Sequence, residues 1–380
     1  MRGRGGSLIF ALVLRRPLSD QFGWTPGAIG IAGTILTLGM FLTGPVVGKM
    51  LDRHGARTIL VWSISLLALA MTAMSLMQAS IALFFAGYGT IIVAGAGTTA
   101  VGYAGTVNGW FERRRGLALA TMMIGSGVTA IVVPLFLAEI IPAHGWRAGY
   151  LACAAIVLLP LPVVLTLLKP APVSDDRGGA RAMAGTTARE ALASRRFWAL
   201  GAASFFVATA LGSVAIHLVP ILSENGLNYQ TAVRTAAFLG AGLILGRVIA
   251  GLLLDKVNTP RVAILPMIST SAAIAMFLYG PAGWLPLAVI LLGIGSGSEG
   301  DAIAYLTARL FGLAHFSELY GYLYGCVALG VATGPLLAAL LLSLGGSYDL
   351  VLMIALLFCP MGASILWTIG SYPDREPLPA

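Results

Sequence analysis

A succession of long apolar stretches constrains this chain more than any other feature of its sequence. A transmembrane helix needs about 20 mainly apolar residues, and every stretch except the first has about that length. Only 10% of the 380 residues are charged, whereas a soluble domain carries roughly 25%. The pattern predicts an all-α membrane protein with twelve transmembrane helices. They are expected near residues 6–19, 27–49, 58–78, 81–107, 117–141, 148–168, 197–219, 232–254, 261–279, 283–306, 317–342 and 348–370.

The first apolar stretch is short because Arg15 and Arg16 interrupt it. We interpret it as the outer half of a truncated first helix whose start is missing, through a late start codon or because the sequence is a fragment. A naturally shortened helix is the alternative.

Basic residues concentrate in alternate loops, as Lys and Arg do on the cytoplasmic side of membrane proteins. Eighteen cations then lie on the cytoplasmic side and four on the other. This asymmetry predicts cytoplasmic termini, and it accounts for the net charge of +8 without a nucleic-acid partner. The eighteen are Arg2, Arg4, Lys49, Arg53, Arg57, Arg113, Arg114, Arg115, Lys169, Arg177, Arg181, Arg189, Arg195, Arg196, Lys256, Arg261, Arg309 and Arg375; the four are Arg15, Arg16, Arg147 and Arg234.

One connector, residues 169–196, differs from the others in being long, polar and rich in proline and glycine. We interpret it as a cytoplasmic linker with a surface helix near Thr187–Arg195. It divides the chain into an N-terminal six-helix bundle (1–168) and a C-terminal one (197–380), which we expect to be pseudo-symmetric.

The two halves repeat a short charged motif. Gly48-x3-Asp52-Arg53 returns 203 residues later as Gly251-x3-Asp255-Lys256. Internal duplication in parallel orientation is typical of transporters built from two bundles.

The first of these loops, residues 48–57, reads GKMLDRHGAR and resembles the signature of the major facilitator superfamily (MFS), Gly-x-x-x-Asp-Arg-x-Gly-x-Arg. The resemblance implies the MFS fold and alternating access. It also implies that the loop acts as a cytoplasmic gate. The alternative is that its cations only set the membrane topology. The expected gate residues are Gly48, Asp52, Arg53, Gly55, Arg57, Gly251, Asp255 and Arg261.

Arg247 lies within the expected eighth helix, about 15 residues or roughly 22 Å along it from Ala232. A buried arginine in a membrane costs at least ~2.5 kcal/mol on insertion scales and therefore usually has a partner or a ligand. Its guanidinium can hold a carboxylate by two parallel hydrogen bonds. We expect Arg247 to bind an anionic substrate; snorkelling or pairing with Asp255 is the alternative.

Four further patterns resemble the monocarboxylate transporters and the bacterial oxalate/formate antiporters. They are Arg247-x3-Gly251-x3-Asp255, NGWFERRRGLA at 108–118, GWR at 145–147 and FGW at 22–24. The resemblance implies that Arg247 binds the substrate carboxylate. Oxalate exchangers carry a second cation, a lysine, in helix eleven, but residues 317–342 contain no Lys, Arg or His. A substrate with a single carboxylate is therefore favoured.

Glu299 and Asp301 lie late in the expected tenth helix, at a depth close to that of Arg247. Two residues apart on a helix, they face different ways. One of them can pair with Arg247 or take up a proton, because burial in a low dielectric favours the neutral carboxyl. The alternative is that they cap the helix end or pair with Arg309.

Four other residues are candidates for the substrate site. Tyr103, Tyr320 and Tyr324 can line a cavity, with helix packing as the alternative. His217 can titrate near neutral pH, although a structural, hydrogen-bonded histidine is the competing interpretation.

The sequence contains no phosphate-binding loop, zinc-spaced Cys/His set or serine triad, so no cofactor, metal or catalytic residue is expected. We predict a monomeric secondary transporter in the plasma membrane (the inner membrane of a bacterium) that carries a small monocarboxylate with a proton. An exporter of hydrophobic or cationic compounds is the alternative, and an integral-membrane enzyme is a more distant one.

Overall fold

The computed structural model describes residues 18–19, 21–111, 114–168, 185–257 and 260–370, and these ranges are almost entirely helical. Within them β-type pairing is confined to one isolated bridge between Gly185 and Gly312. The all-α prediction is therefore confirmed. The expected first helix, most of the linker and both termini lie outside the described residues.

The N-terminal part forms the expected second to sixth crossings. Its elements are α2 (Pro26–His54), α3 (Ala56–Ser75), α4 (Ile81–Gly95), η1 (Ala96–Thr98), α5 (Ala100–Trp110), α6 (Arg115–Leu158) and α7 (Leu161–Leu167). The short 3₁₀ helix η1 joins α4 to α5, and the three together make one crossing.

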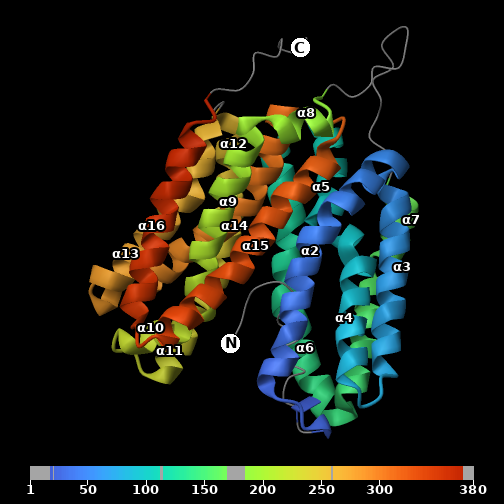
Figure 1. Ribbon diagram of the computed structural model, residues 1–380, viewed down its shortest axis with the longest axis horizontal. Helices are drawn as coiled ribbons and strands as arrows, with labels where there is room; N and C mark the ends of the chain where they lie inside the picture. Colours follow the sequence, from blue (N-terminus) through green and yellow to red (C-terminus); the bar gives the residue numbers. More distant parts are fainter. Residues whose placement is uncertain (1–17, 20, 112–113, 169–184, 258–259, 371–380) are drawn as a thin grey trace.

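Helix α6 is 44 residues long, or about 66 Å at 1.5 Å per residue, which is twice the ~30 Å of bilayer hydrocarbon. Gly145 interrupts it with φ 80° and ψ 169°, a conformation that glycine adopts without steric cost. The chain reverses there (Figure 1). The first arm of α6 is thus the expected helix near 117–141, and its second arm together with α7 is the one near 148–168.

The C-terminal part begins with a short surface helix and continues through six crossings. Its elements are α8 (Ala188–Ala193), α9 (Arg195–Ile216), α10 (Leu218–Glu224), α11 (Tyr229–Ala236), α12 (Phe238–Lys256), η2 (Pro260–Ile264), α13 (Leu265–Tyr279), η3 (Ala282–Trp284), α14 (Leu285–Phe311), α15 (Phe316–Ser343) and α16 (Tyr348–Trp367).

The surface of the described part is suited to a bilayer. Ten helical segments in it are long and apolar enough to cross a membrane. Large apolar side chains remain exposed, among them Leu42 (67%), Leu69 (65%) and Leu159 (72%). Contact of such surface with water costs roughly 25 cal/mol per Å², whereas lipid tails cover it without that cost.

Helix starts follow the local sequence. Six helices begin after a Ser, Thr or Asn whose side chain accepts a hydrogen bond from an amide of the first turn. At α8, Thr187 and Glu190 cap each other reciprocally, and these hydrogen bonds lower the pKa of the Glu190 carboxyl. The expected surface helix near Thr187–Arg195 is confirmed. The six capping residues are Thr25, Ser80, Thr187, Ser194, Asn228 and Ser347.

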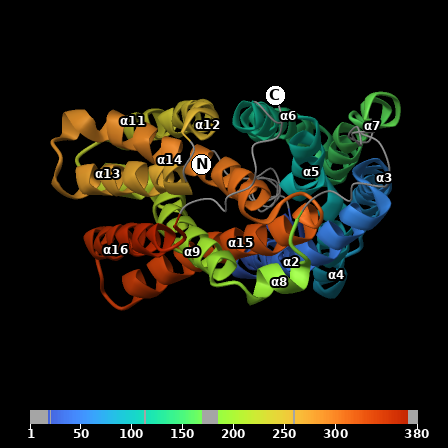
Figure 2. The same cartoon turned by 90° about the horizontal axis from the view of Figure 1, so that it is seen from above.

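Two groups of helices lie side by side, α2–α7 and α9–α16 (Figures 1 and 2). The first group has its own apolar core, which includes Leu67, Phe84 and Tyr150. A larger core is built mostly from the second group and includes Leu292 and Leu319. These separate cores support the division at residues 169–196, which stays a proposal.

Candidate functional site

Helices α2 and α15 lie alongside each other, as Figure 2 shows. They meet at the end of the molecule that holds the loop 48–57. We call this end the signature end. The Asp52 carboxylate accepts hydrogen bonds from the amides of Ser317 (3.0 Å) and Glu318 (2.9 Å) in the first turn of α15. Gly48 permits this approach, because a Cβ there would overlap the Ser317 carbonyl. An anion at a helix N-terminus satisfies free N–H groups and complements the helix dipole, so Asp52 holds α2 to α15.

A second seam of the same design joins α12 to α6. The Asp255 carboxylate accepts hydrogen bonds from the amides of Gly116 (2.7 Å) and Leu117 (3.0 Å), in the first turn of α6. Gly251 permits the close approach, since a Cβ there would lie 2.9 Å from the Gly116 carbonyl oxygen. This seam thus also depends on a carboxylate and a glycine one turn apart.

The two seams are related by the internal repeat. Asp52 and Asp255 lie 203 positions apart, and the capped helix starts at Gly116 and Ser317 lie 201 positions apart. Each carboxylate caps a helix that belongs to the other half of the chain. The sequence analysis assigned both carboxylates to a gate without naming their partners, and the structure shows that these are helix starts.

Two cations among the expected gate residues, Arg57 and Arg261, contact groups within their own half of the chain. Arg57 donates to the Leu165 carbonyl oxygen at the end of α7, at 2.6 Å. The guanidinium of Arg261 stacks over the Trp367 ring, 4.2 Å from its centroid. Both contacts fix loops at the signature end. Of the remaining motif residues, Arg53 is exposed and Gly55 makes the α2–α3 turn with φ 80°.

A cavity of about 370 Å³ lies at the signature end, beside the first seam. Asp52, Arg57 and Phe316 are among its lining residues, whereas Arg247 and Asp301 are not. The cavity therefore lies at the signature end and is separate from the buried charges described next.

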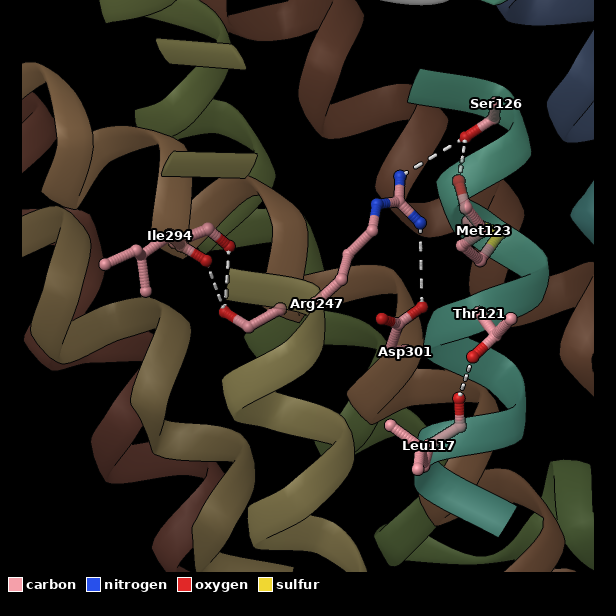
Figure 3. Close-up of polar contacts among 9 residues, drawn as sticks. Leu117, Thr121, Met123, Ser126, Arg247, Ile294 and Asp301 are labelled. Carbon is pink, nitrogen blue, oxygen red and sulfur yellow. Dashed lines mark hydrogen bonds and ion pairs between the residues drawn. The ribbon is translucent and has the colours of Figure 1, made fainter. Parts of the chain in front are cut away.

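A pair of opposite charges is buried between the two groups of helices. Arg247 of α12 is 7% exposed and Asp301 of α14 is 1% exposed. The Arg247 Nη1 atom lies 3.8 Å from the Asp301 Oδ1 atom. Its Nη2 atom donates to the Ser126 hydroxyl of α6 at 3.3 Å, so the guanidinium lies between the halves (Figure 3).

Most of the hydrogen-bonding capacity of this pair is unused. A guanidinium has five N–H donors, but the Nε and Nη1 atoms of Arg247 have no hydrogen-bond partner among the described residues. The same holds for both carboxylate oxygens of Asp301. The two charges form an ion pair at 3.8 Å, but neither side chain uses all its hydrogen-bonding groups. Arg247 therefore keeps N–H donors that are not used by the described residues.

The structure distinguishes between the two acidic residues of α14. Asp301 faces Arg247, whereas Glu299, 7% exposed, lies on another side of the helix, where its charge is in electrostatic range of Tyr324 and Cys359. Asp301 lies ten residues before the end of α14 at Phe311, or about 15 Å. It is thus remote from the helix end that it was alternatively expected to cap.

Of the candidate tyrosines, two lie near the charged pair. Tyr320 and Tyr324 of α15 are buried or half-buried, their ring centroids are 5.8 Å apart, and Arg247 is in electrostatic range of both. Tyr103 of α5 instead packs against an apolar cluster that contains Leu60 and Val164. Helix packing is the contact that the structure shows for it.

His217 lies at the end of α9, remote in depth from Arg247. Its Nδ1 atom is 3.4 Å from the Tyr348 hydroxyl, and the two rings are 5.5 Å apart. His217 is 22 residues beyond the start of α9 at Arg195, and Arg247 is nine residues before the end of α12 at Lys256. Their heights above the signature end differ by about 20 Å, so His217 holds a structural contact.

Ser126 is the residue of this site that the sequence interpretation missed. It lies between Gly125 and Gly127. A hydroxyl flanked by glycines in a membrane helix is a usable signal, because small neighbours let a long polar side chain from another helix reach it.

Comparisons with known proteins agree with this architecture. The model of the Major Facilitator Superfamily matches residues 5–309. Monocarboxylate transporter 10 of Danio rerio is 24% identical over 350 residues, which cover 88% of this chain and 68% of that protein. The fujikurins efflux protein of Gibberella fujikuroi is 23% identical over 379 residues, covering 93% and 75%.

A solved structure has the same fold. The fucose:proton symporter of Escherichia coli matches with a TM-score of 0.71 at 16% identity, covering 96% of this chain and 97% of the symporter. The family match extends over most of the chain and includes both seam carboxylates, Asp52 and Asp255. This chain belongs to the Major Facilitator Superfamily.

Proposed function

We propose that the protein is a secondary transporter that carries a small monocarboxylate anion together with a proton. The observation that carries this proposal is the buried Arg247–Asp301 pair, at 3.8 Å and with free hydrogen-bonding capacity on both sides. A carboxylate fits a guanidinium through two parallel hydrogen bonds. Arg247 then binds the substrate carboxylate, which replaces Asp301 as the partner of the guanidinium.

Charge balance links substrate binding to a proton. The site holds one positive and one negative side chain, both at most 7% exposed. Adding a carboxylate alone leaves a net negative charge in a low-dielectric interior, which is costly. A proton taken up by Asp301 restores neutrality. One proton per carboxylate is therefore the stoichiometry that the site favours.

The number of carboxylates on the proposed substrate follows from the number of cations near the site. Helix α15 carries Tyr320 and Tyr324 toward the charged pair but contains no Lys, Arg or His between residues 317 and 342. A second carboxylate would have no cation on this helix. We therefore propose lactate-, pyruvate- or acetate-like anions over dicarboxylates.

We propose that the two seams form the cytoplasmic gate. Asp52 and Asp255 must leave the starts of α15 and α6 before the signature end can open. The excess of loop cations supports a cytoplasmic position for this end and for both termini, in the plasma membrane. A monomer suffices, since both seams and the site are built within one chain.

The test is uptake of labelled lactate, pyruvate and acetate into proteoliposomes with an imposed pH gradient. We expect wild-type accumulation of at least one anion, a loss of at least tenfold in Arg247→Ala, and partial retention in Arg247→Lys, which keeps the charge but loses the planar pair of donors. Equal uptake by wild type and Arg247→Ala would contradict the carboxylate role.

An exporter of larger apolar compounds is the second candidate, favoured by the match to a protein named as an efflux protein. Export of a fluorescent hydrophobic dye by the same proteoliposomes, insensitive to Arg247→Ala, would support it. An enzymatic role has no such support, because the family and the fold are those of transporters.

A further inference from the structure

The hydrogen bond from Arg247 to Ser126 crosses between the two halves of the chain. It continues the second seam inward, because Asp255, Gly251 and Arg247 follow one another at intervals of four residues on α12. On α6, Asp255 contacts Gly116 and Leu117. Gly251 lies against Gly116 and Ala120, and Arg247 reaches Ser126. The proposed substrate-binding arginine is therefore itself part of the seam.

The first seam differs at the matching position. Gly44 precedes Arg247 by 203 residues and packs against the Gly321 backbone, where an added Cβ would lie 2.8 Å from the carbonyl oxygen. Backbone packing of this kind has no atom that a substrate can compete for. Only the α6–α12 seam, of the two described, ends in a group that also binds the proposed cargo.

From this asymmetry we infer that Ser126 is the residue that couples substrate binding to opening of the signature end. The inference rests on the proposed function of Arg247. Without substrate, the Nη2 atom of Arg247 donates to the Ser126 hydroxyl and holds α6 against α12. A carboxylate that takes the Nη2 atom releases Ser126, because a charged acceptor forms a stronger hydrogen bond than a hydroxyl does.

The local geometry allows this exchange. Ser126 is exposed, so its contact with Arg247 is not enclosed by other side chains on the Ser126 side. Its hydroxyl also donates to the Met123 carbonyl oxygen at 2.7 Å, so it keeps a hydrogen bond after release (Figure 3). The exchange therefore leaves the Ser126 hydroxyl with a hydrogen bond, and α6 is free to separate from α12 once Asp255 no longer caps α6.

The test measures how readily the second seam opens. Leu254 of α12 is 1% exposed and faces α6 at Gly116, so the thiol of Leu254→Cys reports opening through its reaction with a polar maleimide. The background replaces Cys153, Cys326 and Cys359 by Ala. Labelling rates are measured in lipid nanodiscs, with and without lactate, pyruvate or acetate at acidic pH.

In the Leu254→Cys background with Ser126 intact, we expect slow labelling that substrate accelerates several-fold. Ser126→Ala should label about tenfold faster without substrate, equivalent to ~1.4 kcal/mol, and respond little to substrate. Ser126→Thr keeps the hydroxyl and should behave as wild type. The matched control is Thr129→Ala on the same helix, because its hydroxyl bonds only its own helix, at the Gly125 carbonyl oxygen.

Slow labelling of Ser126→Ala without substrate, or a full substrate response in that variant, would overturn the coupling role. A general packing defect would accelerate labelling but leave the response to substrate intact. If none of the three anions accelerates labelling with Ser126 intact, the proposed cargo fails, while the substrate-free comparison still decides whether Ser126 holds the seam.

Discussion

The Asp52 carboxylate accepts a hydrogen bond from the backbone amide of Ser317, 265 residues later in the chain, at 3.0 Å. The same relationship joins Asp255 to Gly116 at 2.7 Å. Each half of the chain thus supplies one carboxylate and one helix start. The signature end is closed by two contacts of the same kind, and the charged pair lies deeper along one of them.

The first prediction concerns these two caps. Replacing a capping side chain by Ala costs about 0.5–2 kcal/mol, so Asp52→Ala and Asp255→Ala should each shift the equilibrium toward the open signature end by roughly two- to thirtyfold. Asp52→Asn should shift it less, since Asn still accepts a hydrogen bond. Reaction of a thiol introduced at the signature end measures the shift.

These two substitutions should be nearly additive, because the seams lie on different helices and share no partner. A double variant that labels no faster than either single variant would contradict the picture of two independent caps.

The second prediction concerns Gly48. A Cβ at this position would overlap the Ser317 carbonyl oxygen, which is backbone and has little freedom to move. Gly48→Ala should therefore destabilise the closed form by about 1–3 kcal/mol and reduce transport. Gly89→Ala on α4 is the control, since no described atom lies within 4 Å of a Cβ there. Normal transport by Gly48→Ala would show that the seam is looser than described.

The third prediction separates the two acidic residues of α14. Asp301→Asn should abolish accumulation driven by a pH gradient, because the carboxyl that pairs with Arg247 is then replaced by an amide that cannot take up the proton. Exchange of labelled for unlabelled substrate should persist, because the arginine still binds the anion. Glu299→Gln should retain pH-driven accumulation.

Uptake driven by the pH gradient and substrate counterflow, measured on the same proteoliposomes, distinguish these outcomes. Accumulation by Asp301→Asn that still follows the pH gradient would assign proton coupling to another group, with Glu299 as the next candidate.

The membrane-spanning helices and the family could be predicted from local properties of the sequence. Apolar runs of about 20 residues favour transmembrane helices, because every backbone polar group must be hydrogen-bonded within the bilayer. The motif at 48–57 and its repeat at 251–261 needed no structure to be seen. The surface helix at α8 was predictable too, since its capping box is local.

The sequence did not show which groups the buried and capping charges contact. Whether Arg247 pairs with Asp255, Glu299 or Asp301 could not be decided from spacing, because spacing along a helix does not fix which side chains of other helices it faces. The helix starts that Asp52 and Asp255 cap lie 265 and 139 residues away, and Ser126 carries no charge to mark it.

The sequence by itself determined the helices, their order, the repeat and the presence of a buried cation, because these depend on hydropathy and on neighbours a few residues apart. Only the tertiary structure decided that Asp301 faces Arg247, that Ser126 reaches it from the other half, and that Tyr103 and His217 lie in other contacts. Those outcomes depend on how each helix is rotated about its axis, and that rotation is set by packing between segments far apart in the chain.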